Sequence, residues 1–297
     1  MVTKIIDGKE LASKLRQTLK AEVARLEGLK AKPCLAVILV GSDPASLSYV
    51  TAKKKACAEV GILSKDFSFP AEVRQEELLS FLKGLNADPE VSGILVQLPL
   101  PDPLSEEAII EAIDPVKDVD GFSPINVGRL VLGQKTFIPP TPYGVLKILE
   151  AYGIQTEGKH AVIVGRSNIV GKPLANLLIQ KSGLANATVT VCHSHTKDLA
   201  FFTQKADILI AAAGKPALIR REMVKEGAVV IDVGVNRLPD SSKPQGYSLV
   251  GDVDFQGLVG WASYLTPVPG GVGPLTVTML LANTLLAFRR QQGLEQG

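Results

Sequence analysis

A continuous apolar run, Cys34–Val40, ends directly at Gly41. A strand with one face in water alternates polar and apolar residues, whereas an unbroken apolar run indicates a strand that is buried on both faces. Strands of that kind are typical of parallel sheets with helices on both sides. A second apolar strand is predicted at residues 93–97, where a proline-rich segment then breaks it. The chain is therefore expected to begin with a parallel sheet.

Helices are predicted around these strands. Asp7 is placed to cap a helix over residues 8–29, in which leucine and valine recur every three or four residues along one stripe. A helix over residues 44–60, a short strand over 66–69 and a helix over 75–85 follow. The alternation of strand and helix predicts an α/β layer structure for this part of the chain.

Two segments rich in proline and glycine divide the chain. The first, residues 136–143, contains Pro139, Pro140 and Pro142, and the second is residues 266–274. Between them lies a second βα series, and an apolar helix over residues 275–290 follows the second segment, where it can return to the first domain. We therefore predict an α/β fold with two domains, residues 1–140 together with 275–297, and residues 141–274. In the second domain, strands are expected at 161–164, 188–191, 208–212 and 229–233, after a helix at 143–152.

Charge and apolar content exclude several classes of partner. The chain carries 32 Lys and Arg residues against 30 Asp and Glu, a net charge of +2. Nucleic-acid-binding proteins usually carry a marked basic excess, so no nucleic-acid partner is expected. No apolar stretch reaches the roughly 20 residues that span a bilayer, and the first residues contain no apolar signal core. The three scattered cysteines predict free, buried thiols. We expect a soluble, cytoplasmic protein with no membrane partner.

The segment after the strand at 161–164 has the pattern of a phosphate-binding turn. Gly165 permits a tight turn, Gly171 permits close approach of the backbone, and the start of the next helix offers free N–H groups to a phosphate. The glycine spacing departs from Gly-x-Gly-x-x-Gly, so a plain turn between strand and helix is the alternative.

The residues around this turn favour NADP over NAD. An enzyme that uses NAD usually has an acidic residue after the second strand, whereas here Ser194 follows His193. Arg166 stands in the glycine turn, and a guanidinium suits a phosphate dianion, although Arg166 can also be a solvated turn residue. His193 and His195 would point the same way from a strand end. No third ligand is evident, and zinc sites usually have at least three, so no metal is predicted.

Four polar residues of the first domain are candidates for catalysis. Tyr49 and Lys53 are one helical turn apart and share one helix face, near the carboxyl end of a parallel sheet, where ligands commonly bind. Gln97 ends an apolar strand, where a buried amide needs a polar partner. Asp120 precedes Gly121 in a turn and can accept hydrogen bonds from a ring N–H and an amino group.

Lys53 and Asp120 each have a plainer interpretation, and the spacing of Tyr49 and Lys53 also occurs in another family. Lys53 begins a run with Lys54 and Lys55, which is also typical of a solvated helix face, and Asp120 fits an ordinary Asx turn. The Tyr-x-x-x-Lys spacing also occurs in short-chain dehydrogenases. There it follows the cofactor turn, whereas here it comes more than a hundred residues before it. The order along the chain therefore argues against that family.

Several stretches, each weak alone, form a specific set when they are taken together in this order. They are Val40-Gly41-Ser42-Asp43-Pro44-Ala45-Ser46 with Tyr49 and Lys53, Val96-Gln97-Leu98-Pro99-Leu100-Pro101, Lys117-Asp118-Val119-Asp120-Gly121, Gly165-Arg166-Ser167 through Gly171 and Pro173, Ile231-Asp232-Val233-Gly234, Gly251-Asp252-Val253, and Thr266-Pro267-Val268-Pro269-Gly270-Gly271-Val272-Gly273-Pro274. The set resembles the bifunctional methylenetetrahydrofolate dehydrogenase/methenyltetrahydrofolate cyclohydrolase family. One departure is Pro140, where the family commonly has cysteine.

The resemblance implies a homodimeric oxidoreductase and hydrolase of one-carbon metabolism, with its active site between a folate-binding catalytic domain (residues 1–140) and a Rossmann-like NADP-binding domain (residues 141–274). The enzyme would oxidise methylenetetrahydrofolate with NADP and hydrolyse the methenyl product to formyltetrahydrofolate, which supplies purine and amino-acid biosynthesis. Tyr49, Lys53, Gln97 and Asp120 would be catalytic, with Lys53 as the proton carrier. The folate would contact Tyr49, Lys53, Val96, Gln97, Leu98, Asp120, Pro269, Gly270 and Gly273, and NADP would contact Gly165, Arg166, Ser167, Ser194 and Ile231.

Two other functions fit parts of the pattern. Another two-domain NADP-dependent dehydrogenase, of the shikimate or amino-acid type, would also place an α/β substrate domain ahead of the cofactor domain. A nucleotide sensor without activity would need the glycine turn but not the set of Tyr49, Lys53, Gln97 and Asp120. Turnover of methylenetetrahydrofolate against that of shikimate separates the first alternative, and binding of NADPH without turnover of any folate would indicate the second.

Overall fold

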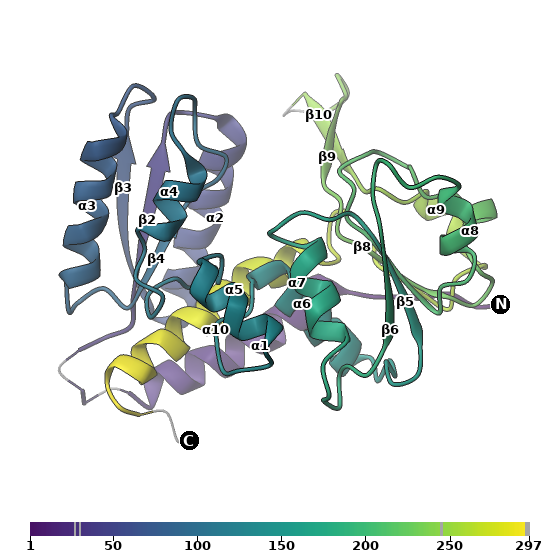
Figure 1. Ribbon diagram of the computed structural model, residues 1–297, viewed down its shortest axis with the longest axis horizontal. Helices are drawn as coiled ribbons and strands as arrows, with labels where there is room; N and C mark the ends of the chain where they lie inside the picture. Colours follow the sequence, from purple (N-terminus) through teal and green to yellow (C-terminus); the bar gives the residue numbers. More distant parts are fainter. Residues whose placement is uncertain (27, 30, 244–245, 295–297) are drawn as a thin grey trace. The chain divides into compact units, whose positions relative to one another are not determined.

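The computed structural model describes residues 1–26, 28–29, 31–243 and 246–294. These residues fall into two compact units (Figure 1). The three-stranded unit contains Ser13–Pro140 and the chain from Val277 onward. The six-stranded unit contains Met1–Ala12 and Thr141–Thr276. No helix among the described residues is long and apolar enough to cross a membrane.

The sheet of the three-stranded unit confirms the α/β prediction. Its strands are parallel and lie in the order β3 (Leu63–Phe69), β2 (Cys34–Val40), β4 (Gly93–Val96). Every residue of the central strand β2 is buried, as its apolar run predicts. Alternate residues of β2 enter separate cores on the two faces of the sheet. Leu35 and Val37 enter one core, and Ala36, Ile38 and Val40 enter the other.

Helices cover both faces of this sheet (Figure 1). Residues of α2 (Pro44–Val60) and of the C-terminal helix α10 (Gly273–Gln291) share a core with one face. Residues of α3 (Gln75–Ala87) and α4 (Glu106–Glu111) share a core with the other face. The predicted return of the C-terminal helix is thus confirmed. Its residues Leu280, Leu281 and Leu285 are buried in this core.

Helix α1 (Gly8–Ala24) begins at the predicted residue, where the Asp7 carboxylate accepts an amide hydrogen bond of 2.9 Å from the first turn. It ends before the predicted residue 29. The Leu26 amide donates to the carbonyl three residues earlier, which closes the last turn, and Gly28 has a φ of +114°. Residue 27 lies outside the described residues.

Asn283 on α10 fastens two chain segments to the three-stranded unit. Its Nδ2 donates to the carbonyls of Val119 and Ile138, both at 2.8 Å, and its side chain is buried. Each carbonyl left without a donor costs about 1–3 kcal/mol. Asn283→Ala is therefore expected to lower the free energy of unfolding by about 2–5 kcal/mol. Calorimetry should show a lower unfolding midpoint, while Thr18→Ala, which removes an exposed hydroxyl, should leave it near the wild-type value. Equal midpoints for Asn283→Ala and the wild type would contradict this role.

The six-stranded unit is a doubly wound parallel sheet. Strand β5 (His160–Val164) lies between β6 (Thr188–Cys192), at one edge, and β7 (Ile208–Ala211). The strand order therefore reverses at β5, which is where ligands bind in open α/β sheets. Beyond β7 the sheet continues through β8 (Val229–Asp232), β11 (Tyr264–Leu265) and β1 (Lys4–Ile5). The helices of this unit are α6 (Pro140–Ala151), α7 (Gly171–Leu178), α8 (Leu199–Thr203) and α9 (Phe255–Leu258).

The division of the chain differs from the predicted one at the N-terminus. Residues 1–12 were expected with the first domain but belong to the six-stranded unit, because β1 pairs with β11 along its edge. The Thr3 hydroxyl also donates a hydrogen bond of 2.7 Å to the Ala262 carbonyl, next to the pairing of β1 with β11. Strand β1 has two residues, which are too few to show the alternation that would predict a strand from the sequence. The antiparallel hairpin of β9 (Asn236–Pro239) and β10 (Tyr247–Val250) was also not predicted.

The proline-rich junction is in part helical. Helix α6 starts at Pro140, three residues before the predicted start at 143. Proline lacks an N–H, but the first turn of a helix leaves its N–H groups without helical partners anyway, so proline is tolerated there. Pro140, the departure from the family pattern, thus stands where a helix accepts it.

Candidate active site

Helix α2 places Lys53 against the sheet. Its buried stripe includes Ala56, Cys57 and Val60, which pack in the core with β2. Lys53 lies one turn before Cys57 and therefore on the same side of the helix, at its edge toward the carboxyl end of the sheet. Tyr49 lies one further turn back, and its side chain is 46% exposed. The local sequence thus buries the lysine and leaves the tyrosine ring available.

Lys53 and Gln97 are joined directly. The Lys53 Nζ donates to the Gln97 Oε1 at 2.9 Å. The Gln97 Nε2 in turn donates to the Leu98 carbonyl at 2.7 Å, which fixes the orientation of the amide. Gln97 directly follows β4, whereas Lys53 lies on α2, the helix that follows β2. The hydrogen bond therefore joins the segments that follow two neighbouring strands. The expectation that the Gln97 amide needs a polar partner agrees with this geometry.

Burial lowers the pKa of Lys53. The removal of water disfavours the charged ammonium, while the nearby Asp120 carboxylate acts in the opposite direction and more weakly. The neighbouring Lys54 and Lys55 are not among the causes of this pKa shift. Lys54 is exposed and paired with Asp66 at 3.0 Å. The pKa of Lys53 is thus lowered by the burial of its side chain and not by the neighbouring basic residues.

Asp120 stands in a turn that buried side chains hold in place. The Asp118 carboxylate accepts hydrogen bonds from the Ser123 amide at 2.8 Å and from the Asn126 Nδ2 at 2.9 Å. Gly121 has a φ of +68°, and a Cβ there would meet the Phe137 carbonyl at 2.6 Å. The turn therefore needs a glycine at this position, and a simple Asx turn at Asp120 is not what fixes it.

The carboxyl group of Asp120 has an unusual affinity for its proton. Burial raises its pKa to about 7, Lys53 counteracts this in part, and the Asp118 carboxylate adds to it. Asp120 and Lys53 therefore titrate as an interacting pair. Titratable groups whose environments shift their pKa values toward neutrality are candidates for acid–base chemistry. Asp118 and Asn126 were not singled out from the sequence, although Asp118 lies only two residues before Asp120.

The other predicted folate contacts are divided between the two units. Val96 is a buried residue at the end of β4, and Leu98 is half-buried beside Gln97. Pro269, Gly270 and Gly273 belong to the six-stranded unit, so their contact with a folate stays a prediction.

The glycine turn of the six-stranded unit has the expected close packing. A Cβ on Gly171 would meet the Gly165 carbonyl oxygen at 2.1 Å, so only glycine lets α7 begin there. The Ser167 hydroxyl accepts a 3.2 Å hydrogen bond from the Val170 amide at the start of α7. Arg166 is exposed beside the turn. These residues fit a phosphate, because the backbone approaches closely and a helix N-terminus faces the turn.

A cavity of about 370 Å³ joins this turn to the next two strand ends. Residues after β5, β6 and β7 line it, which is the reversal point of the sheet. Ile231 is not among the lining residues, and its side chain is buried in the described structure. A cofactor contact at Ile231 stays a prediction and would use the main chain. Of the predicted residues, the cavity brings together Gly165, Arg166, Ser167 and Ser194.

His193 also lines this cavity, close to His195. The His193 Nδ1 accepts a hydrogen bond of 3.2 Å from the His195 amide, so this nitrogen is already used. Burial and the charge of Arg166 lower the pKa of His193. Within the described residues, no group of three His, Cys, Asp or Glu side chains is arranged to hold a metal.

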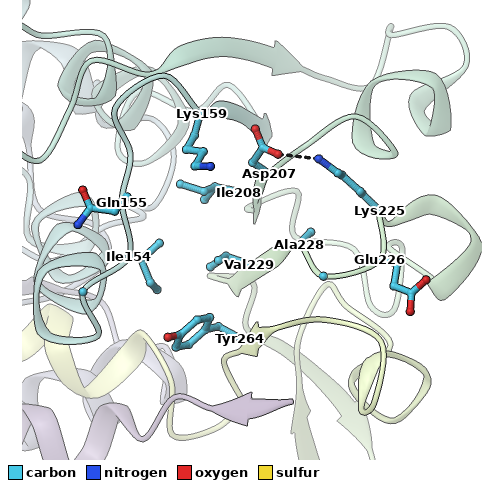
Figure 2. A pocket seen from close by; sticks show the side chains of 12 residues that line it. Ile154, Gln155, Lys159, Asp207, Ile208, Lys225, Glu226, Ala228, Val229 and Tyr264 are labelled. Carbon is cyan, nitrogen blue, oxygen red and sulfur yellow. Dashed lines mark hydrogen bonds and ion pairs between the residues drawn. The ribbon is translucent and has the colours of Figure 1, made fainter. Parts of the chain in front are cut away.

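A separate cavity of about 270 Å³ lies at the opposite, amino end of the six-stranded sheet (Figure 2). Lys159 precedes β5, and Asp207 precedes β7. Asp207 pairs with Lys225 at 2.7 Å, and this bond is the main cause that lowers the pKa of Asp207. No predicted site residue is among those that line this cavity in the described structure, so it is distinct from the candidate site.

Comparisons with known proteins identify both parts of the chain. The model of the tetrahydrofolate dehydrogenase/cyclohydrolase catalytic domain matches residues 6–120, and that of the family's NAD(P)-binding domain matches residues 139–292. Bifunctional protein FolD from Chlorobium phaeobacteroides is 56% identical over 289 residues, which cover 96% of this chain and 98% of that protein.

Solved structures give the same result. The bifunctional FolD methylenetetrahydrofolate dehydrogenase/cyclohydrolase from Campylobacter jejuni is 50% identical, has a TM-score of 0.91, and covers 97% of this chain and 99% of its own. The Trypanosoma brucei enzyme, solved with NADP cofactor and inhibitor, is 42% identical with a TM-score of 0.93 and covers 98% of each chain.

The shikimate-type alternative is similar in fold alone. Shikimate 5-dehydrogenase from Thermus thermophilus is 19% identical with a TM-score of 0.52. Since both family models match and the full-length relatives are more than half identical, the chain belongs to the tetrahydrofolate dehydrogenase/cyclohydrolase family.

Proposed function

We propose that this chain oxidises methylenetetrahydrofolate with NADP and then hydrolyses the methenyl product to formyltetrahydrofolate. Tyr49, Lys53, Gln97 and Asp120 serve the folate in the three-stranded unit. Gly165, Arg166, Ser167 and Ser194 serve the cofactor in the six-stranded unit. The observation that carries the proposal is the half-buried Lys53 ammonium, held at 2.9 Å by Gln97 and electrostatically linked to Asp120.

The oxidation step asks little acid–base work of the protein. When bound, NADP supplies the acceptor for the hydride that leaves the folate methylene carbon. The folate nitrogens stabilise the resulting cation, so the protein's task is to align the reactants. The exposed Tyr49 ring can stack on the substrate, while the glycine turn and the N-terminus of α7 bind phosphate.

Hydrolysis needs a proton carrier. Water adds to the methenyl carbon and loses one proton. The ring then opens at a carbon–nitrogen bond: the hydroxyl loses its remaining proton to solvent as the formyl C=O forms, and the leaving nitrogen gains a proton. Lys53 with a lowered pKa can accept the first and return it, as general acid–base catalysis near neutral pH requires. Gln97 fixes the direction of the amine.

One assay tests the function directly. The purified protein is given methylenetetrahydrofolate with either NADP or NAD, and absorbance follows the reduced cofactor and the methenyl compound together. We expect reduction of NADP at the higher efficiency and subsequent decay of the methenyl signal. A protein that binds NADPH but turns over no folate would instead be a sensor, and turnover of shikimate would favour the other dehydrogenase class.

Asp120 is expected to hold the pterin head of the folate. Asp120→Asn keeps one acceptor oxygen but loses the charge, so the Kd for a folate should rise by about tenfold, the loss of one charge-assisted hydrogen bond. The Kd for NADP should stay at the wild-type value. Titration calorimetry with each ligand measures both. An unchanged folate Kd would contradict a contact between Asp120 and the pterin head.

The same variant has a signature in the pH profile. The Asp120 carboxylate stabilises the charged form of Lys53, so its removal should lower the pKa of Lys53 further. The cyclohydrolase rate rises as Lys53 loses its proton, and the acidic limb of the profile should therefore move to lower pH in Asp120→Asn. Glu59→Gln, an exposed carboxylate on the same helix as Lys53, serves as the control. A limb that moves to higher pH would contradict the proposed pairing.

The homodimer and the cytoplasmic location expected from the family belong to this proposal as well. The support for both is the resemblance and the family membership. Light scattering on the purified protein tests the dimer: a mass of one chain would contradict it, whereas twice the chain mass of 31.5 kDa would agree.

A further inference from the structure

Asp252 is a fully buried carboxylate that binds a turn of backbone. Its Oδ2 accepts hydrogen bonds from the amides of Ala213 at 2.6 Å and Gly214 at 2.9 Å, and its Oδ1 accepts one from the Lys215 amide at 2.9 Å. The Asn236 Nδ2 donates a fourth, also at 2.9 Å. Three consecutive amides thus point at one side chain, an arrangement that a negative charge favours.

The turn held in this way borders the cofactor cavity. Ala213 and Lys215 line it, opposite the glycine turn after β5. The residue before this turn packs on the glycine turn, since a Cβ on Gly165 would meet the Ala212 carbonyl oxygen at 2.1 Å. A displacement of the Ala213–Lys215 turn would therefore disturb the glycine turn too.

A second buried carboxylate holds Asp252 itself. Asp232, at the end of β8, accepts hydrogen bonds from the amides of Asp252 and Val253, both at 3.0 Å. Two glycines make room for the pair. A Cβ on Gly234 would meet the Asp252 carboxylate at 2.2 Å, and a Cβ on Gly251 would meet that of Asp232 at 1.8 Å. The chain thus has glycines where the two carboxylates lie.

We propose that Asp252 is a positioning residue for NADP, which keeps the Ala213–Lys215 turn in the geometry that the cofactor requires. The inference rests on the proposed cofactor site at the glycine turn. Asp252 does not line the cavity and acts through the backbone amides of the turn. Its effect should therefore be common to NADP and NAD, unlike that of a residue that recognises the additional phosphate.

Asp252→Asn tests the proposal with nearly the same side-chain volume. Whichever way the amide is oriented, its NH₂ group meets backbone N–H donors where an oxygen accepted them. The Kd for NADPH and that for NADH, both measured by titration calorimetry, should each rise by about tenfold. This factor follows if the turn keeps its competent geometry for about a tenth of the time.

The bifunctional family supplies an internal control. Hydrolysis of methenyltetrahydrofolate added without cofactor depends on residues of the three-stranded unit, so its kcat/KM should stay within about twofold in Asp252→Asn. A matched control variant is Asp254→Asn, which removes the charge of the residue that caps α9, two positions along the chain. That variant should bind NADPH with the wild-type Kd.

The outcomes are separable. Weaker binding of both cofactors with intact hydrolysis supports the proposal. A wild-type Kd in a folded Asp252→Asn protein overturns it, as does a loss of hydrolysis in parallel with binding, which would indicate a general loss of folding. If the wild-type protein itself binds no NADPH, the proposed cofactor site fails, independently of Asp252.

A milder variant covers the case in which Asp252→Asn does not fold. Asn236→Ala removes the one side-chain donor to Asp252 and leaves its three bonds to the turn. It should raise the Kd for both cofactors by about two- to threefold, because the carboxylate loses only part of its support. An unchanged Kd in this variant would then overturn the proposal.

Discussion

Replacement of Lys53 by methionine is expected to lower cyclohydrolase turnover by about a hundredfold or more, the usual effect of losing a general acid–base group. Methionine keeps the length and the apolar stem of the side chain but carries no proton. The dehydrogenase step should decrease less, because hydride transfer depends on alignment. In the assay with methylenetetrahydrofolate and NADP, the methenyl compound should therefore accumulate instead of decaying.

A control variant and a separate assay of the second step test this prediction. Lys55→Met removes a neighbouring, exposed lysine of the same helix and should leave both activities near the wild-type rates. Hydrolysis of the added methenyl compound by Lys53→Met, measured without cofactor, isolates the second step. Wild-type hydrolysis there would make Lys53 an ordinary helix lysine and would remove the proposed mechanism. Equal losses in both steps would instead point to a role in binding the folate.

The contact between Lys53 and Gln97 can be anticipated from the sequence, for reasons that are local. The buried strands β2 and β4 are evident from unbroken apolar runs, and the parallel sheet places their carboxyl ends together. The spacing of Tyr49 and Lys53 gives one helix face, and the amide of Gln97 after an apolar strand requires a partner. Each step uses residues within one element and its neighbour.

The supports of Asp120 are harder to predict, because they join residues far apart in the chain. Asn283 binds Val119 across 164 positions, and it does so from an apolar helix whose pattern indicates only packing. Asp118 and Asn126 form a buried polar pair that joins a turn to the first turn of the short helix α5 (Pro124–Val131). A polar residue inside an apolar helix is a signal that some partner exists, but the sequence alone does not identify it.

The six-stranded unit shows the same limit. The strand β1 consists of two exposed residues whose place is fixed only by pairing with β11 near the other end of the chain. Likewise, Asp232 and Asp252 stand in recognisable Asp-Val-Gly and Gly-Asp-Val stretches. The bonds of Asp252 to the Ala213–Lys215 turn and of Asp232 to the Asp252 amide become visible only in three dimensions. Pattern predicts elements here, whereas the loops between them depend on tertiary contacts.

Arg166 is expected to account for most of the preference for NADP. It lies exposed at the glycine turn and lines the cofactor cavity together with Ser194, while an acidic residue for the ribose of NAD is absent from this strand end among the described residues. A charge-assisted contact to phosphate contributes about 1.5–3 kcal/mol, or about ten- to hundredfold in affinity. Arg166→Ala should therefore raise the KM for NADP by about ten- to hundredfold and change that for NAD little.

Two further measurements separate recognition of the phosphate from a general effect of charge. Lys181→Ala, which removes an exposed cation of the same unit outside the cavity, should leave both KM values unchanged. The Arg166 charge also lowers the pKa of His193, so Arg166→Ala should raise that pKa, as an NMR titration of the histidine ring would record. Equal increases of KM for NADP and NAD would assign Arg166 to the shared part of the two cofactors, and the discrimination would then have to come from Ser194 and its neighbours.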